Sequence, residues 1–167
     1  MPLVIEHRLR IDAPAQTVWE VISNLDCYPE WNPFVVACSS TLAVGDPIRM
    51  RVRVLPGLAQ RQTERILDHE PGRRLCYGIP ASALGALASR RSHEVTALTH
   101  EVTALTPERA EYVSRFELDG WLAPLVSLLL GHRLAAGFES MSLALQARAE
   151  AQGDDRWPGP AGPASSP

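Results

Sequence analysis

Residues 13–34 read APAQTVWEVISNLDCYPEWNPF, and this stretch carries most of the information about the fold. Pro14 favours the first turn of a helix, and apolar residues follow it at helical spacing: Val18, Val21, Ile22 and Leu25. Further along, Pro29 and Pro33 prevent any long helix. The stretch therefore predicts a short amphipathic helix and then a turn-rich connection to the next element.

Segments of strand type lie on both sides of this stretch. Leu3 to Ile11 alternates between apolar and polar residues, as a strand does. After the turn-rich connection, turn signals at Gly45-Asp46, Pro56-Gly57 and Pro71-Gly72 separate several further strand candidates. These candidates are Val35 to Thr41, Pro47 to Leu55, Gln60 to His69, Arg73 to Ile79 and, near the end, Ala110 to Leu118.

A long helical pattern begins beyond Gly120 and runs to about Glu150. Its apolar stripe recurs at helical spacing: Leu130, Leu134, Phe138, Met141 and Leu145. Strand, helix, antiparallel strands and a long terminal helix predict an α+β domain in two layers, with a curved antiparallel sheet wrapped around the helix. Residues 151–167 are dense in Pro, Gly and Ser, so we expect a domain over residues 1–150 and a flexible tail.

The heptad HEVTALT occurs twice in succession, over residues 93–106, which indicates a tandem duplication or an engineered insertion. Its Val and Thr content favours a strand. Because side chains alternate along a strand, an insertion of odd length inverts the faces beyond it, so the two copies cannot occupy equivalent places in one strand.

We expect the short turn Thr106-Pro107-Glu108-Arg109 to place the second copy, His100 to Thr106, in the strand that pairs with Ala110 to Leu118. The first copy, His93 to Thr99, would then be displaced toward the irregular stretch 80–92. One alternative is a homodimer formed through an exposed edge of the duplicated strand. Another is a short helix, since four apolar residues have coiled-coil spacing: Val95, Leu98, Val102 and Leu105.

Composition and charge limit the class of function. The chain has 167 residues, 46% of them hydrophobic, which suits one domain with a real core. A net charge of −3 and a pI near 5.9 argue against nucleic acid as the main partner. Arg49, Arg51 and Arg53 alternate on one strand face, and a solvated face explains them better than a phosphate-binding groove.

The sequence also bears on location. The start, MPLVIEHRLR, has no cationic segment followed by an apolar run, so nothing suggests secretion. The longest apolar stretch, Leu122 to Leu130, is too short to span a bilayer, and we expect no stable membrane insertion. Cys27, Cys38 and Cys76 lack metal-ligand spacing, so we expect reduced, partly buried thiols in a cytoplasmic protein.

Two sets of motifs carry a family resemblance. The first is an Ala-Pro, a Val-Trp helix and a Tyr-Pro-x-Trp-Asn-Pro turn, matched by Ala13, Pro14, Val18, Trp19, Tyr28, Pro29, Trp31, Asn32 and Pro33. The second runs from Phe116 through Gly120-Trp121 to Leu125 and continues in Gly137-Phe138-Glu139-x-Met141. With these motifs the chain resembles the SRPBCC, or START-like, superfamily over roughly residues 3–150, and especially its polyketide cyclase/dehydrase-like bacterial members.

The resemblance implies a helix-grip fold with a cavity between the sheet and the C-terminal helix, where a hydrophobic small molecule or lipid would bind. A sheet this curved cannot lie flat along a straight helix, so a gap between them is also physically reasonable. The candidate lining residues are Trp31, Phe34, Met50, Val52, Trp121, Leu125, Leu129, Phe138 and Met141. For each of them ordinary core packing is at least as good an interpretation, and we assign Trp19 to the core as the anchor of the first helix.

The sequence contains few signs of catalytic chemistry. It has no nucleophile motif, phosphate-binding loop or metal-ligand spacing, so we expect no cofactor or metal. His93 and His100 are weak acid–base candidates, although a surface or hydrogen-bonded structural role explains both better. Glu64 and Arg65 are neighbours in a central strand, so one should point inward, near the mouth of the cavity, where it could orient a polar ligand group.

Two functions of different classes follow from these observations. The first is a module that binds a hydrophobic small molecule or lipid. The second is a cyclase or dehydratase that positions a polyketide-like substrate in the same cavity and moves protons on it. Because the sequence shows no convergent set of ionisable residues, it favours the binding module.

Overall fold

The computed structural model of the chain describes residues 3–55, 57–81, 85–98 and 109–155. Within these residues seven strands form one antiparallel sheet in the order β1-β7-β6-β5-β4-β3-β2. The strands are β1 (Leu3–Ile11), β2 (Val35–Ser39), β3 (Pro47–Leu55), β4 (Leu58–Glu70), β5 (Arg74–Ile79), β6 (Ala88–Leu98) and β7 (Arg109–Asp119). The helical elements are α1 (Ala15–Ser23), the short 3₁₀ helix η1 (Leu25–Cys27), α2 (Tyr28–Trp31) and α3 (Ala123–Asp155).

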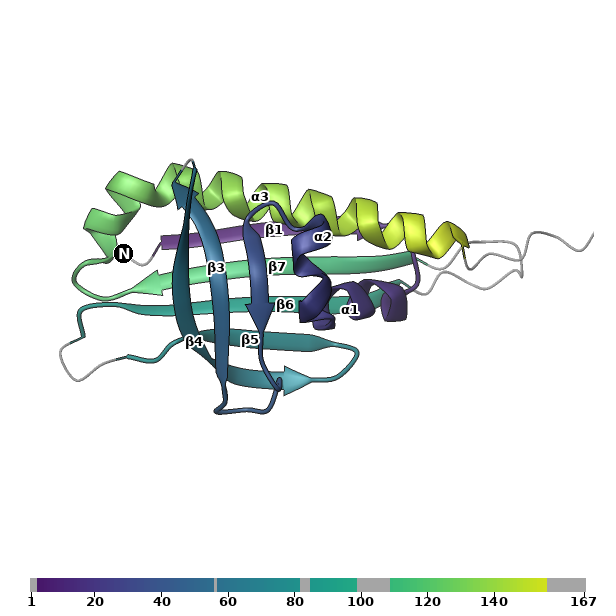
Figure 1. The fold of residues 1–167 in the computed structure, drawn as a ribbon, viewed down its shortest axis with the longest axis horizontal. Helices are drawn as coiled ribbons and strands as arrows, with labels where there is room; N and C mark the ends of the chain where they lie inside the picture. The colour runs from purple at the N-terminus through teal and green to yellow at the C-terminus, as the bar shows by residue number, and fades with distance from the viewer. Residues whose placement is uncertain (1–2, 56, 82–84, 99–108, 156–167) are drawn as a thin grey trace, which may run out of the picture.

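The sheet curves around α3, which lies along it for most of its length (Figure 1). This arrangement confirms the α+β, helix-grip prediction. Phe138, Met141, Leu145 and Ala149 form the buried stripe of α3, and α1 adds Val18, Trp19 and Ile22 to the same core. Trp19 is therefore a core residue, as expected, and it also stacks on His69 with 5.8 Å between ring centroids.

The turn after α1 shows why its sequence determines the start of the sheet. The Tyr28 hydroxyl donates to the backbone oxygen of Ile22 at 2.8 Å, which ties α2 back to α1. Asn32 Oδ1 accepts from the backbone nitrogens of Phe34 at 3.0 Å and Val35 at 2.8 Å. A buried side-chain amide thus satisfies backbone donors that precede the ladder of β2.

Close packing brings Phe34, the residue before β2, against the middle of α3. A Cβ added at Gly137 would lie 2.3 Å from the ring of Phe34, which no real contact allows. The glycine therefore lets Phe34 approach the helix backbone, and Phe34 then meets Phe138 edge-on with 5.0 Å between ring centroids.

The predicted elements match the observed ones closely. The strand expected at Leu3 to Ile11 is confirmed, and each of the later strand candidates differs from the observed strand by at most a few residues at either end. The terminal helix extends to Asp155, beyond the expected end near Glu150, so the first part of the segment assigned to the tail is helical. The rest of that segment, residues 156–167, lies outside the described residues.

The placement of the duplicated heptad was wrong. The described residues of the first copy, His93 to Leu98, lie in β6, where His93 pairs with Ser114 and Leu98 with Arg109 of β7. Within β6 the described part of the heptad is strand, so the helical alternative is wrong as well. The second copy, His100 to Thr106, lies outside the described residues.

Continuity of the ladders explains why the first copy takes this place. β6 begins at Ala88, inside the stretch expected to be irregular, and pairs with β5 from Ser89 to Glu94 and with β7 over its whole length. Keeping the first copy in the strand preserves both ladders and the inward direction of His93 and Val95. If the second copy took this place, Ser89 to Ser92 would no longer continue into the strand and would lose their pairing with β5.

Candidate functional site

Polar side chains from four neighbouring strands are buried on the inner face of the sheet. Glu64 comes from β4, Tyr77 from β5, Arg91 and His93 from β6, and Tyr112 from β7, and all five are buried. Strand alternation directs them inward, since residues two apart share a face. Fold topology thus assembles a set of ionisable groups whose members lie far apart in the sequence.

His93 is the centre of a hydrogen-bonded chain. Its Nδ1 lies 2.7 Å from the Tyr112 hydroxyl and its Nε2 lies 3.2 Å from the Tyr77 hydroxyl. Burial, and then the positive charge of Arg91, holds the pKa of His93 well below its usual range, so the imidazole is neutral and one ring nitrogen donates while the other accepts. Burial also raises the pKa values of Tyr77 and Tyr112, which keeps both phenols protonated.

Arg91 is a buried cation with unused hydrogen-bond donors. Its guanidinium carbon lies 3.9 Å from the ring centroid of Phe138, and its Nη2 lies 3.8 Å from Met141 Sδ. Nε and Nη1 are buried and find no hydrogen-bond partner in the described part of the chain. Among the described residues, no carboxylate forms an ion pair with Arg91, although the charge is close enough to Glu64 to lower the pKa of that carboxyl.

Glu64 is the inward member of the Glu64–Arg65 pair, and Arg65 is exposed. Burial raises the pKa of Glu64 to about 7, against the smaller lowering effects of a hydrogen bond from Gln62 Nε2 and of Arg91. The carboxyl is therefore half protonated near neutral pH and can either donate or accept a proton. Together with burial, the nearby Glu64 raises the pKa of Cys38 to about 12, so that thiol stays protonated.

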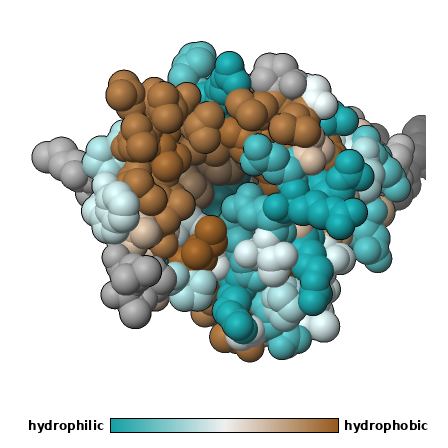
Figure 2. Space-filling view, turned by 60° about the vertical axis from the view of Figure 1, so that its left-hand side comes forward, coloured by the Kyte–Doolittle hydropathy of each residue, from teal (hydrophilic) through white to brown (hydrophobic). Residues whose placement is uncertain are grey.

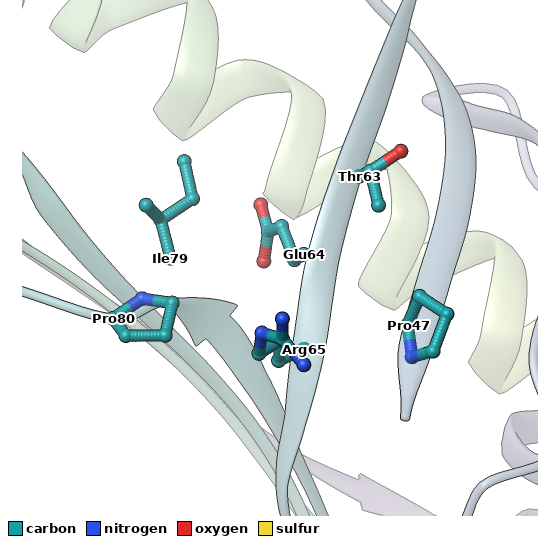
Figure 3. Close-up of a pocket in the computed structure, with 6 residues that line it drawn as sticks. All are labelled: Pro47, Thr63, Glu64, Arg65, Ile79 and Pro80. Carbon is teal, nitrogen blue, oxygen red and sulfur yellow. The ribbon is translucent and has the colours of Figure 1, made fainter. Parts of the chain in front are cut away.

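A pocket of about 340 Å³ opens beside Glu64, lined by Pro47, Thr63, Glu64, Arg65, Ile79 and Pro80. Figure 3 shows the Glu64 carboxylate on the side of β4 that faces Ile79, whereas Thr63 points to the other side. A second pocket of similar volume lies between the β3–β4 hairpin and α3, and its lining includes Phe34, Arg53, Leu55, Arg133 and Gly137.

The residues predicted to line a cavity fall into two groups. Phe34, Met50, Val52, Phe138 and Met141 are buried in the core, and Trp31 is partly buried against Tyr28. Trp121, Leu125 and Leu129 lie on exposed surface where α3 begins. Of the whole set, Phe34 lines one of the two pockets.

Among the catalytic candidates, the structure brings His93 and Glu64 onto the same face, and His100 lies outside the described residues. Sequence reasoning missed Arg91, Tyr77 and Tyr112. The parity of β6 could have found Arg91, because it shares a face with His93 and Val95. In the described part of the chain, no group of His, Cys, Asp and Glu side chains could hold a metal ion.

A curled antiparallel sheet that grips one long helix, with ionisable groups buried between them, is the architecture of the START-like class. The chain belongs to the family described as polyketide cyclase/dehydrase and lipid transport, whose model matches residues 2–150. The resemblance to the SRPBCC superfamily is thereby confirmed. No curated protein matches the chain.

Solved structures show the same fold. The Zhui aromatase/cyclase from Streptomyces sp. R1128 is 23% identical, with a TM-score of 0.63 over 93% of this chain and 96% of that one. A START superfamily protein from Mycobacterium smegmatis is 18% identical, with a TM-score of 0.63 over 89% and 98% of the two chains. A truncated norcoclaurine synthase from Thalictrum flavum is 16% identical, with a TM-score of 0.61 over 87% and 92%.

Proposed function

We propose that this protein binds a hydrophobic small molecule or lipid between the inner face of the sheet and α3, and that the bound molecule carries an oxygen acceptor. The observation that carries the proposal is the buried guanidinium of Arg91, whose Nε and Nη1 have no hydrogen-bond partner among the residues that the structure describes. A carboxylate, an enolate or a carbonyl oxygen would satisfy these donors.

An unpaired buried cation such as that of Arg91 destabilises the folded protein. A charge removed from water is costly unless hydrogen bonds replace its hydration, and in Arg91 the ring of Phe138 and the sulfur of Met141 replace only part of it. A ligand oxygen would recover the missing interactions. The apolar part of the ligand would then contact the aromatic side chains around Arg91, namely Phe34, Phe116 and Phe138.

Glu64 adds a second polar group to the same inner face. Near neutral pH its carboxyl is available in both protonation states, so it can donate a hydrogen bond to a ligand oxygen or accept one from a hydroxyl. It also lines the pocket that opens at the end of β5, which would admit the ligand to the inner face. The family description, which includes lipid transport, supports a ligand of this chemistry.

A matched pair of fluorescent probes tests the proposal. Anilinonaphthalene sulfonate is an apolar anion, and phenylnaphthylamine has the same aromatic skeleton without the sulfonate. Replacing Arg91 by Met should lower the affinity for the anion about tenfold or more, the effect of losing one charge-assisted hydrogen bond, and should leave the affinity for the neutral probe unchanged. The variant should fold, because an apolar residue of similar length replaces an unpaired buried charge.

Arg90 provides the control, since it precedes Arg91 in β6 and is exposed on the outer face. Arg90→Met should bind both probes as the wild type does. Equal loss of the anionic probe in both variants, or failure of the wild type to bind either probe in a saturable way, would contradict the proposal.

A second candidate function is proton transfer to or from a bound polyketide-like substrate, as in a cyclase or dehydratase. The specific observation that favours it is Glu64, a buried carboxyl with a pKa of about 7 at a pocket, the range in which a general acid or base works best. Two of the structural neighbours have enzyme names, an aromatase/cyclase and a norcoclaurine synthase.

Turnover of a linear poly-β-ketone analogue would test this candidate. Activity should depend on a group that titrates near pH 7, and Glu64→Gln should abolish that dependence together with most of the rate while the probes still bind. Full activity in Glu64→Gln would exclude Glu64 as the acid or base.

A further inference from the structure

Four large apolar side chains are exposed where α3 begins: Trp121 is 69% exposed, Leu125 52%, Leu128 82% and Leu129 66%. We call these four residues the α3 tip patch. Figure 2 looks at the end of the molecule where α3 begins and shows hydrophobic surface gathered on one side of a hollow, with hydrophilic surface on the other. Single exposed leucines need no explanation, whereas a contiguous apolar patch marks a contact surface.

The patch belongs to the outward face of α3. Leu125, Leu128 and Leu129 recur at helical spacing, and the next outward positions are the exposed His132 and Arg133. The inward face of the same turns is already occupied by the core, with Ala123 buried and Val126 packed against it. Leu125, Leu128 and Leu129 are therefore not part of the core that the described residues form.

Basic residues lie beside the patch. Arg133 and Arg53 line the same pocket between α3 and the β3–β4 hairpin, and within the described residues neither of them forms an ion pair. Leu58, on the same hairpin, is a further exposed apolar residue. Asp119, two residues before Trp121, is the exposed carboxylate closest in sequence to the patch. The surface thus has an apolar tip, the cation of Arg133 one helical turn further along α3, and the cation of Arg53 on the hairpin that shares a pocket with Arg133.

We propose that the α3 tip patch docks on the surface of an anionic phospholipid bilayer, with its leucines and Trp121 among the acyl chains and Arg53 and Arg133 at the phosphates. Tryptophan and leucine on one side of a helix and cations behind them suit the interface between headgroups and hydrocarbon. In the described part of the chain no helix is long and apolar enough to cross a bilayer, so the contact is peripheral.

The size of the patch favours a bilayer over a second copy of the chain. A stable protein interface buries about 800 Å² on each partner, and four side chains on a helix tip do not provide that area by themselves. A bilayer needs no complementary shape, and each cation near an anionic leaflet adds roughly fivefold to the affinity. The charge complementarity therefore points to a surface of anionic lipid.

Docking there would bring the membrane close to the candidate site. The backbone nitrogens of Trp121 and Leu122 donate to the backbone oxygens of Gly85 and Ala86 at 3.3 and 3.1 Å. Gly85 and Ala86 belong to the connection between β5 and β6. Ile79 at the end of β5 and Pro80 at the start of that connection line the pocket beside Glu64. A hydrophobic molecule could then exchange between bilayer and pocket, although docking itself does not depend on the ligand proposed above.

Co-sedimentation with vesicles tests the proposal. The wild type should bind vesicles of phosphatidylcholine with about a third phosphatidylglycerol and should bind pure phosphatidylcholine much more weakly, because two cations contribute. Leu128→Glu should lower binding to the anionic vesicles about tenfold or more, since it places a charge among the acyl chains. Leu143→Glu is the matched control, as Leu143 is 51% exposed further along α3 and outside the patch; it should bind as the wild type does.

A charge variant separates the two parts of the surface. Arg133→Gln should lower binding to anionic vesicles roughly fivefold and leave the weak binding to neutral vesicles unchanged. Binding of the two naphthalene probes by Leu128→Glu should equal that of the wild type, so failure of docking and failure of the ligand proposal are distinguishable.

Three outcomes would overturn the proposal: no binding of the wild type to anionic vesicles, equal binding of Leu128→Glu and the wild type, or a wild-type dimer that Leu128→Glu converts to a monomer. The last would show that a second copy of the chain covers the patch.

Discussion

The inner and outer faces of the sheet both carry charged side chains, but these side chains differ in burial and in ion pairing. On the outer face of β1 and β7, Arg8 contacts Glu111 at 2.6 Å, and Arg115 contacts Glu6 at 3.0 Å and Glu117 at 2.7 Å. On the inner face Glu64 and Arg91 are buried, and neither forms an ion pair within the described residues. The charged groups on the outer face have ion-pair partners and are also in contact with water. Glu64 and Arg91 on the inner face are shielded from water and have no ion-pair partner among the described residues.

This difference bears on which face has a function. Exposed ion pairs contribute little to stability, because water already solvates both partners and salt screens them. Buried and incompletely paired charges cost stability, so a fold that keeps them gains something other than stability from them. The proposed ligand, rather than folding, would account for the burial of Glu64 and Arg91 on the inner face.

The largest expected effect is the dependence of stability on the ionisation of Glu64. Its folded pKa of about 7 lies above the usual value of 4.5, so between these pH values the folded state binds more protons than the unfolded chain. Stability from this group is full below pH 4.5 and is lost as pH rises through 7, on the order of 3 kcal/mol in all. The unfolding free energy of Glu64→Gln should not contain this pH-dependent loss, because a glutamine does not ionise. Urea unfolding of the variant and the wild type at pH 4.5 and at pH 8 measures the difference.

Glu70→Gln is the control for this measurement, since Glu70 is exposed at the end of the same strand. Its unfolding free energy should follow that of the wild type at both pH values. Parallel pH curves for Glu64→Gln and the wild type would mean that the carboxylate is solvated in the folded protein.

The next effect concerns the buried chain Tyr112–His93–Tyr77. Tyr112→Phe leaves Nδ1 of His93 without its 2.7 Å partner inside the core, which should cost about 1–3 kcal/mol of unfolding free energy. The same substitution in a His93→Leu background should cost less, because no orphaned nitrogen remains. Equal costs in both backgrounds, measured by chemical denaturation, would show that the hydrogen bond contributes nothing.

A smaller effect is expected from removing one copy of the heptad. Because the copies are identical, deletion of either gives the same protein, with His93 to Leu98 still available to β6. The connection to β7 becomes shorter, and its closure entropy should fall by about 1 kcal/mol. Thermal unfolding should show an equal or higher midpoint, and a shortened protein that fails to fold would mean that residues beyond Leu98 are needed for the sheet.

The smallest effect belongs to the outer face. Arg115→Gln removes the contacts with Glu6 and Glu117, yet all three side chains are partly or largely exposed. The thermal midpoint should change by no more than the error of the measurement, and any change should disappear at high salt. A fall in the thermal midpoint as large as that caused by Tyr112→Phe would show that ion pairs on the outer face stabilise the fold as much as the buried hydrogen bonds do.

The sequence predicts the fold well because its signals are local. Alternation in Leu3 to Ile11, the turn glycines and the apolar stripe of α3 each depend on residues near one another in the chain. The heptad was misplaced because its two copies are identical, so local signals cannot distinguish them. What decided the outcome was the ladder with β5, which begins at Ser89, outside the repeat.

The site was predicted only in part, because its groups come from four strands. Either Glu64 or Arg65 was expected to point inward, and in the structure Glu64 is the inward residue. Arg91 looked like one of many arginines, and only the register of β6 between β5 and β7 reveals that it points inward beside His93. Trp121 and the leucines after it have a core-like composition, yet the end of the sheet leaves them uncovered.

The most direct test of the central claim follows the guanidinium of Arg91 itself. Heteronuclear NMR resolves the Nε–H groups of arginines, and the signal of Arg91 is identified by its loss in Arg91→Met. Titration with anilinonaphthalene sulfonate should shift that signal in step with the rise in probe fluorescence, whereas phenylnaphthylamine should leave it in place, because only the sulfonate offers an acceptor to the buried N–H. An anionic probe that binds tightly while the Arg91 signal stays unchanged would contradict the account.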